Sequence, residues 1–438
     1  MNDSCDWPPP PPKDETSAEK ALRLEREESA KKKSEEIDAA IEQDRVEREK
    51  RGSQRKVLLL GQSQSGKSTL LKSFQLLYAP LAFRAEAEAW RAVIYLNLVH
   101  SINILLEVVE IANIRTSRAI RQLQIRLSPL KHVLATLTQS LSSDSVRARQ
   151  SADNPDIDVW RARRASGISL HSSAWRSLAK VSEPGNVSQY EVDNARNIIV
   201  ACHDDILALW ANEDVHKCLQ DQRVALDGQA SYFLAEAHRI ACSDYFPTDD
   251  DILRARLETF GIEEHCIVSE TVDYGQEWVW YDVEGSRSSR VWVPYFDDVQ
   301  TVMFVCSLAN FDLDVGDDGM NNFTECLRLW KGICENRLLA ESVFFLFLNK
   351  SDLLDDKLKS GVFFGSYVEG FGHRSNDCHT VSQFYKDNFF VVHRDFSPKP
   401  RLLQMHVICA IDTLAMADIF DQTRHAILAS SMERMYTL

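Results

Sequence analysis

The chain of 438 residues lacks an unbroken apolar run of about 18 residues, the length that a membrane-spanning helix needs. Its first residues, Met1 to Asp6, also lack the apolar core of a signal peptide. These two absences predict a cytosolic protein without a transmembrane segment. The chain still contains 44% hydrophobic residues, which is enough for two or three packed cores.

Charge and cysteine spacing exclude two further classes of protein. Lys and Arg total 50 against 65 Asp and Glu, so the formal net charge is -15. Such a balance argues against a general nucleic-acid partner. The ten cysteines include no CxxC pair, and the chain is far larger than a disulfide scaffold, so we expect reduced thiols.

Residues 1–54 are expected to form a tail followed by a partner-docking helix. Five prolines, Pro8 to Pro12, precede a charge-dense stretch without aromatic residues. Within it Ala30, Ile37 and Ile41 have the spacing i, i+7, i+11 and share one stripe of a helix. The helix is either merely solvated, or it binds a partner along that stripe.

Two further patterns divide the remaining chain. In residues 55–82 and 250–438, helical stretches alternate with short apolar runs at 278–281, 301–306, 343–348 and 405–409, which predicts a mainly parallel sheet with helices on both faces. Residues 83–249 show helical periodicity almost throughout and predict an inserted all-helical domain. Inside it, residues 111–190 carry twelve basic against five acidic residues, a net charge of +7. We expect much of this segment to be a mobile basic loop, which is either solvated or bound to an anionic partner such as lipid headgroups.

The segment Gly61-Gln62-Ser63-Gln64-Ser65-Gly66-Lys67-Ser68 fits G-x-x-x-x-G-K-[ST] between an expected strand and an expected helix. This context is specific for a phosphate-binding loop. Backbone N–H groups and the helix N-terminus attract the phosphates, Lys67 adds a positive charge, and the Ser68 hydroxyl ligates Mg²⁺. The predicted contacts are Gly61, Gln64, Ser65, Gly66, Lys67, Ser68 and Thr69.

A second motif predicts which base is bound. Asn349, Lys350 and Asp352 form an NKxD sequence at the end of the expected strand 343–348. The Asp352 carboxylate can accept hydrogen bonds from N1–H and the 2-amino group of guanine, whereas adenine offers an acceptor and no such amine. Ligands of such sheets bind beyond the carboxyl ends of the strands, so the position supports a guanine site.

With both motifs present, the sequence resembles the alpha subunits of heterotrimeric G proteins, with a divergent, fungal-like character, over almost its whole length. Trp90 to Asn97 is similar to the family's first long insertion helix. Asp244 to Thr248 and Asp251 to Gly261 are similar to its switch I, Asp282 to Gly285 to the DxxG of switch II, and Cys409-Ala410 to its TCAT loop. The resemblance implies an α/β fold, in which a Ras-like P-loop GTPase domain carries an inserted helical domain and an N-terminal helix.

The resemblance also implies roles for single residues. Arg256 would be the arginine finger, and Thr259 would join Ser68 as a Mg²⁺ ligand. The remaining implied nucleotide contacts are Leu253, Arg254, Asp282, Gly285, Cys409 and Ala410. Taken singly, Arg254 and Arg256 could equally belong to a solvated helix face, and Thr259 could be a helix cap. Asp282 could be a turn residue and Cys409 a buried thiol. Their order and spacing within one chain favour the functional interpretation.

Several positions depart from the family pattern. Ser63 and Gln64 stand at the third and fourth positions of the phosphate loop, where the family has glycine and glutamate, and Gln64 cannot pair with the arginine finger as an acid would. Ser286 replaces the switch II glutamine that orients the attacking water, and serine is too short for that task. Further departures are Glu284 in switch II, an apparent one-residue deletion between Arg290 and Trp292, and Ile408 and Ile411 in the TCAT loop.

We therefore expect a GTP/GDP switch with Mg²⁺ as cofactor, in which Arg256 and Ser286 occupy the catalytic positions and hydrolysis is slow. The implied partners are a beta-gamma dimer, a G protein-coupled receptor through the C-terminus, and an effector that the sequence does not name. Asn2 excludes the family's N-myristoylation, so Cys5 is the candidate anchor, by palmitoylation, at the cytoplasmic face of the plasma membrane. The alternatives are a G-alpha-like protein that binds guanine nucleotide without hydrolysing it and, less favoured, an ATP-using P-loop kinase.

Overall fold

The structure is a computed structural model that describes residues 20, 54–111, 118–141, 187–221, 226, 228–256, 262–283, 299–315 and 320–437. The chain separates into two compact units, Met1–Gln54 and Arg55–Leu438. Cys5 and the stripe of Ala30, Ile37 and Ile41 lie outside the described residues. The fold described below is that of the second unit.

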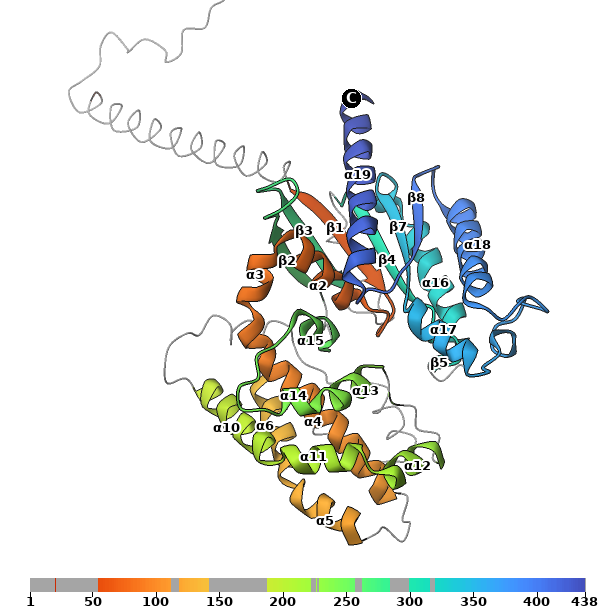
Figure 1. Ribbon diagram of the computed structural model, residues 1–438. Coiled ribbons are helices and arrows are strands. Elements are labelled where there is room, and N and C mark those ends of the chain that lie inside the picture. Colours follow the sequence, from red (N-terminus) through yellow and green to blue (C-terminus); the bar gives the residue numbers. More distant parts are fainter. Residues whose placement is uncertain are drawn as a thin grey trace, which may run out of the picture. The chain divides into compact units, whose positions relative to one another are not determined.

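A six-stranded sheet organises the α/β part of this unit (Figure 1), with the strand order β2-β3-β1-β4-β7-β8. Its strands are β1 (Arg55–Gly61), β2 (Ile262–Val268), β3 (Glu277–Val283), β4 (Thr301–Ser307), β7 (Val343–Asn349) and β8 (Leu403–Val407). All neighbouring pairs are parallel except the β2–β3 hairpin. A separate ribbon joins β5 (Asp314–Val315) to β6 (Met320–Asn321). The predicted fold class is confirmed.

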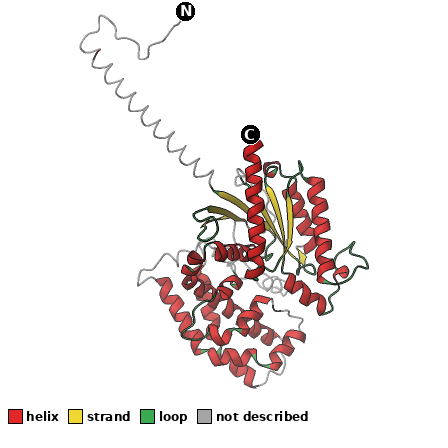
Figure 2. Ribbon diagram, turned by 45° about the horizontal axis from the view of Figure 1, so that its top comes forward, coloured by secondary structure: helices red, strands yellow, loops and turns green. Residues whose placement is uncertain are grey.

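The central strands are apolar on both faces because helices cover both faces (Figure 2). In β4, Phe304 packs into one core while Val305 packs into the other, as the two-residue period of a strand requires. One face carries α16 (Asn322–Cys334), α17 (Ser351–Lys359) and α18 (Cys378–Phe396). The opposite face carries α2 (Lys67–Tyr78) and α19 (Thr413–Thr437). Two 3-10 helices, Arg337–Leu339 and Phe364–Ser366, complete this part.

The two edges of the sheet differ from the sequence expectation. The apolar runs did not predict β2, because Glu263, Glu264 and His265 interrupt this antiparallel edge strand and Ile267 is its one buried residue. At the other edge, β8 ends at Val407, so Ile408 and Cys409 belong to the following loop rather than to the predicted strand. Edge strands are commonly short and carry charged residues, which prevents pairing with another chain, so their apolar signal is weaker.

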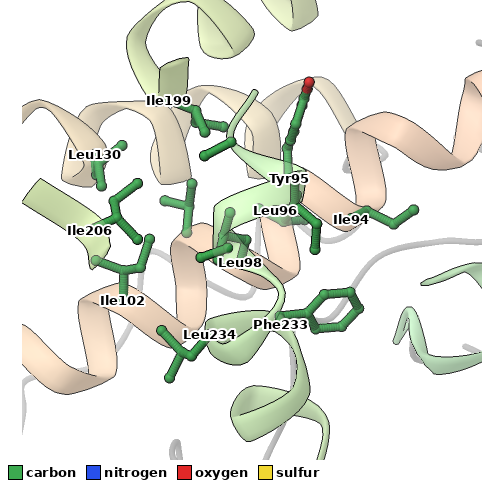
Figure 3. Close-up of a cluster of buried hydrophobic side chains, with 14 of the residues drawn as sticks. Ile94, Tyr95, Leu96, Leu98, Ile102, Leu130, Ile199, Ile206, Phe233 and Leu234 are labelled. Atoms are coloured by element: carbon green, nitrogen blue, oxygen red, sulfur yellow. The ribbon is translucent and has the colours of Figure 1, made fainter. Parts of the chain in front are cut away.

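Among the described residues, the segment between α2 and β2 is mainly helical and has its own hydrophobic core. Its helices are α3 (Pro80–Ala85), α4 (Ala87–Ile111), α5 (Arg118–Arg126), α6 (Pro129–Leu141), α10 (Val187–Ala201), α11 (His203–Trp210), α12 (Glu213–Asp221), α13 (Gly228–Ala235), α14 (Ala237–Ile240) and α15 (Asp249–Arg254). Figure 3 shows Leu98 and Ile102 of α4 among Leu130 of α6, Ile206 of α11 and Leu234 of α13. Helix α4 is thus the central element of this core.

Among the described residues, α4 is the one helix that is long and apolar enough to cross a membrane. It is 25 residues long, and an 18-residue window within it has a mean hydropathy of 1.8, which is sufficient in length and composition for a membrane span. Of that window, 83% is buried inside the protein, so the helix owes its apolar character to its central place in a protein core. Asn97, Ser101 and Asn103 interrupt the apolar run but are themselves buried.

The expectation of a basic loop over 111–190 is wrong for residues 118–141. These form α5 and α6, whose Ile120, Leu123 and Leu130 are buried in the helical core. Residues 142–186 lie outside the described part. The helical core also includes Ile252 and Leu253, beyond the expected domain limit at 249, and the domain limits themselves remain a proposal.

The end of the helical segment is held by one buried carboxylate, that of Asp251. Its oxygens accept hydrogen bonds from both terminal nitrogens of Arg239 (2.8 and 2.7 Å) and from the hydroxyls of Tyr232 (2.9 Å) and Tyr245 (3.0 Å). Asp251 and Thr248 also form a reciprocal capping box at the start of α15. Burial alone would raise the pKa of Asp251, but these hydrogen bonds, that of Arg239 foremost, lower it to about 2.

We expect Asp251→Ala to destabilise the helical segment by about 3 kcal/mol, because it leaves Arg239 and two tyrosine hydroxyls without their shared acceptor. Chemical unfolding followed by circular dichroism measures this loss. Asp250→Ala is the control: Asp250 is the neighbouring carboxylate and pairs with Arg254 at the surface, so its loss should cost less than about 1 kcal/mol. Equal effects would show that Asp251 is not the central acceptor.

Candidate nucleotide-binding site

The phosphate loop connects β1 to α2 and needs glycine at both ends. Gly61 has φ 141° and Gly66 has φ 100°. A Cβ at residue 61 would lie 2.1 Å from the Val305 carbonyl oxygen, and one at residue 66 would lie 2.1 Å from Nδ2 of Asn349. Gln64 also adopts a positive φ of 62°, a conformation that non-glycine residues adopt rarely. The glycines are therefore required by two close approaches, that of the Val305 main chain in β4 and that of the Asn349 side chain at the end of β7.

Lys67 lies at the first position of α2 and folds back over the loop. Its Nζ donates to the carbonyl oxygens of Gly61 and Gln62, both at 3.0 Å. The side chain of Gln62 in turn donates to the Asn322 carbonyl at the start of α16 (3.1 Å). A positive charge thus lies beside the N-terminus of α2, where the helix dipole and free N–H groups favour a phosphate.

Ser68 and Asp282 bring two oxygen ligands together at the carboxyl ends of β1 and β3. The Ser68 hydroxyl donates to Oδ2 of Asp282 at 3.2 Å, and Asp282 is almost fully buried. A hydroxyl beside a carboxylate, next to a phosphate loop, fits Mg²⁺, which prefers hard oxygen ligands and keeps several waters. The described residues contain no cluster of three or more His, Cys, Asp or Glu side chains that would suggest a transition-metal site instead.

Asn349 joins this phosphate loop to the expected base site. Its Nδ2 donates to the Ser65 carbonyl at 2.8 Å, and its Oδ1 accepts from the Ala410 amide at 3.0 Å. The Ala410 carbonyl accepts from the Ser73 hydroxyl of α2 at 2.5 Å. Loops that lie far apart in the sequence are therefore connected through one buried carboxamide.

The base side of the site is formed by the start of α17 and the loop after β8. Lys350 has φ 65° at the N-cap of α17, so the chain turns sharply and Asp352 falls in the first helical turn. Burial, together with the charge and hydrogen bond of Asp352, raises the pKa of the Cys409 thiol to about 11. Cys409 and Asp352 are thus neighbours.

The segment expected to bear the arginine finger spans the end of α15, and its three predicted residues have different surroundings. The Leu253 side chain is fully buried in the helical core, so only its main chain could face a nucleotide. Arg254 pairs with Asp250 at 3.0 Å and stacks over Tyr232. Arg256 lies beyond the helix, and its main chain is bonded to Asn97 of α4.

Sequence reasoning missed the polar residues that hold this segment. Lys72 of α2 donates to the carbonyls of Ile252 (2.7 Å) and Ala255 (2.6 Å), and burial lowers its pKa to about 7. The only signal was a lysine or an asparagine within an otherwise apolar helical face, as at Lys72 and Asn97. Three predicted site residues, Thr259, Gly285 and Ser286, lie outside the described residues.

Comparisons with known proteins identify the family of this chain. A sequence model of the family described as "G-protein alpha subunit" matches residues 31–427. The chain is similar to the guanine nucleotide-binding protein alpha-4 subunit of Mycosarcoma maydis, with 26% identity over 96% of this chain and 93% of the relative. It is 28% identical to the guanine nucleotide-binding protein G(o) subunit alpha of Geodia cydonium (86% and 89% covered) and 27% identical to a guanine nucleotide-binding protein subunit alpha of Emericella nidulans (88% and 91%). Since the family match spans nearly all of the sequence, the chain belongs to the family of G-protein alpha subunits.

Proposed function

We propose that this protein binds GTP and GDP with Mg²⁺ and acts as a signalling switch that hydrolyses GTP slowly. The observation that carries the proposal is the bridge made by Asn349, which ties the phosphate loop at Ser65 to the guanine loop at Ala410. A nucleotide spanning both loops would find its phosphate site and its base site already held at one separation. Members of the family are GTPases in general.

The phosphate side of the site supplies charge and metal ligands. Lys67 would bind the β- and γ-phosphates, while Ser68 and, by resemblance, Thr259 would hold Mg²⁺, with Asp282 accepting from a bound water. When bound, Mg²⁺ neutralises the charge that gathers on the transferring phosphoryl group. Gly61, Gln64, Ser65, Gly66 and Thr69 would provide the main-chain cradle, and the Gly285 amide would sense the γ-phosphate.

Catalysis is divided between two positions. Arg256 would stabilise charge on the γ-phosphate, whereas Ser286 stands where the family's glutamine orients the attacking water. A serine hydroxyl ends closer to the main chain than a glutamine amide does, so it cannot hold a water in line with the phosphate. This substitution favours a long-lived GTP state and keeps open the alternative, a G-alpha-like scaffold that binds guanine nucleotide without hydrolysing it.

Partners and location follow from the family. G-protein alpha subunits in general associate with beta-gamma dimers and receptors. For this chain we propose that the N-terminal helix binds beta-gamma through Ala30, Ile37 and Ile41, and that the C-terminus, which follows α19, contacts the receptor. We propose peripheral attachment at the cytoplasmic face of the plasma membrane, with Cys5 as the palmitoylation site. The effector has no candidate.

Base selectivity is the first test. We expect GDP and GTP to bind far more tightly than ATP, and Asp352→Ala to weaken GDP binding about tenfold or more, because hydrogen bonds to a charged acceptor contribute roughly 1.5–3 kcal/mol. Competition against labelled GDP measures both effects. Asp355→Ala is the matched control, because Asp355 lies on the same helix and pairs with Lys359 at the surface. Displacement by ATP as effective as by GTP would contradict a guanine site.

Hydrolysis separates the switch from the scaffold. In single-turnover assays at saturating Mg²⁺, we expect wild type to be slower than relatives that carry the glutamine, and Ser286→Gln to recover part of the rate. Arg256→Ala should slow it further. Arginine fingers of GTPases, this family's among them, generally contribute about 10³–10⁵ in rate, a known magnitude rather than one obtained from this structure. Arg84→Ala, which removes an exposed arginine paired with Asp249, is the control. A wild-type rate equal to that of ordinary relatives would refute slow hydrolysis, and no measurable hydrolysis would favour the scaffold.

Beta-gamma binding tests the N-terminal stripe. Replacing Ile37 and Ile41 together by glutamate would place charge in a buried apolar interface, which is costly, while a solvated helix would tolerate it. We therefore expect the double variant to lose beta-gamma in a pull-down assay but to keep GDP binding. Equal capture of the variant and the wild type would mean that the helix is only a charged segment.

A further inference from the structure

The side chain of Asn97 lies against the main chain of Arg256. Its Oδ1 accepts from the Arg256 N–H at 3.3 Å, and its Nδ2 lies 3.3 Å from the Arg256 carbonyl oxygen, to which it donates. Nδ2 also donates to the Val93 carbonyl one turn earlier in α4, at 2.7 Å. One carboxamide therefore engages both main-chain polar groups of a single residue, as a neighbouring β-strand would.

The chain around Arg256 is fixed by other side chains as well. Lys72 donates to the carbonyls of Ile252 and Ala255, and Gln229 donates to the carbonyl of Arg254. Together with Asn97 of α4, these donors come from three different elements, α2, α4 and α13, and they act where α15 ends and the backbone becomes extended at Ala255. Asn97 contacts Arg256, the residue of this segment that is expected to be the arginine finger.

The burial of Asn97 indicates that its hydrogen bonds do more than satisfy its own amide. Asn97 is only 7% exposed in a helix that is apolar on nearly all sides. The other polar residues buried in α4, Ser101 and Asn103, each donate to a carbonyl four residues earlier in the same helix, Asn97 and Val99 respectively. Such a local bond would satisfy Asn97 in part, yet its amide also reaches a residue 159 positions away.

We propose that Asn97 is a positioning residue for Arg256: it holds the Arg256 main chain so that the guanidinium meets the γ-phosphate of bound GTP. The inference rests on the proposed function of Arg256. An arginine side chain has several rotatable bonds, so a fixed main chain reduces the volume that the guanidinium must search. A displacement of about 1 Å at a reacting group can cost about a hundredfold in rate.

The test is a double-mutant cycle with Asn97→Ser and Arg256→Ala in the full chain. Serine should keep the bond to the Val93 carbonyl, as Ser101 makes the equivalent bond, but it is too short to reach Arg256. We expect Asn97→Ser to slow single-turnover GTP hydrolysis about tenfold or more and to have little further effect in the Arg256→Ala background. Asn103→Ser is the matched control, because the Asn103 amide bonds only within α4 in the described part of the chain; it should leave the rate unchanged.

A second readout does not depend on turnover. Aluminium fluoride with GDP imitates the transferring phosphoryl group, so Asn97→Ser should weaken the binding of this pair while leaving GDP binding and the thermal unfolding midpoint close to wild type. If Asn97→Ser does not fold, Asn97→Ala is used in the same cycle. Equal slowing by Asn97→Ser with and without Arg256, or equal slowing by Asn103→Ser, would overturn the inference alone. A rate indifferent to Arg256→Ala would overturn the role of Arg256 and, with it, that of Asn97.

Discussion

The buried carboxamide of Asn349 is the interaction on which the rest of the site depends. It donates to the phosphate loop, accepts from the loop after β8, and occupies the space that a side chain at residue 66 would need. Because it is neutral, it joins these loops without the desolvation cost of a buried charge. Gly66 and Asn349 are thus complementary, because any side chain at residue 66 would displace the Asn349 carboxamide.

A second group of polar contacts holds the segment 248–256. Unlike Asn349, the side chains in this group are ionisable. Asp251 accepts hydrogen bonds from Arg239 and two tyrosines. The ammonium group of Lys72 donates hydrogen bonds to two carbonyls at the end of α15. Both groups are buried, and burial acts on both pKa values. The hydrogen bonds that the Asp251 carboxylate accepts outweigh the effect of burial and lower its pKa, whereas burial lowers the pKa of Lys72 to about 7. This segment joins the helical core to the phosphate-loop helix through hydrogen bonds rather than through apolar packing alone.

The proposed mechanism depends on both groups of contacts. In the proposed mechanism, the residues that fix charge beside the phosphates, Lys67 and Arg256, are kept and supported by buried contacts. The residue that would orient water is replaced by Ser286. Binding and charge stabilisation depend on the fold as a whole, whereas water orientation depends on a single side chain. A family member can therefore lose hydrolysis rate while its nucleotide site stays intact.

The sequence by itself determined the features that are local. The phosphate-loop motif at 61–68 and the NKxD motif at 349–352 could be found in the sequence because each needs particular residues only a few positions apart. The loop needs a glycine at a positive φ, and the NKxD motif needs a carboxylate in a first helical turn. The order of strands and helices, and hence the α/β fold class, followed from apolar periodicity in the central strands. The pattern was weaker at β2, and the basic composition of 118–141 was mistaken for a loop although its apolar residues form helical stripes.

Only the tertiary structure decided which distant residues meet. Nothing in the sequence showed that Asn97 would reach Arg256, that Lys72 would bond to the end of α15, or that Asp251 would gather Arg239 and two tyrosines. A single asparagine or lysine in an apolar helix has many potential partners, and its partner depends on how whole elements pack. The physical reason is that a buried polar group needs a hydrogen-bond partner, but this requirement does not specify which residue the partner is. The fold decides that when it brings donor and acceptor together.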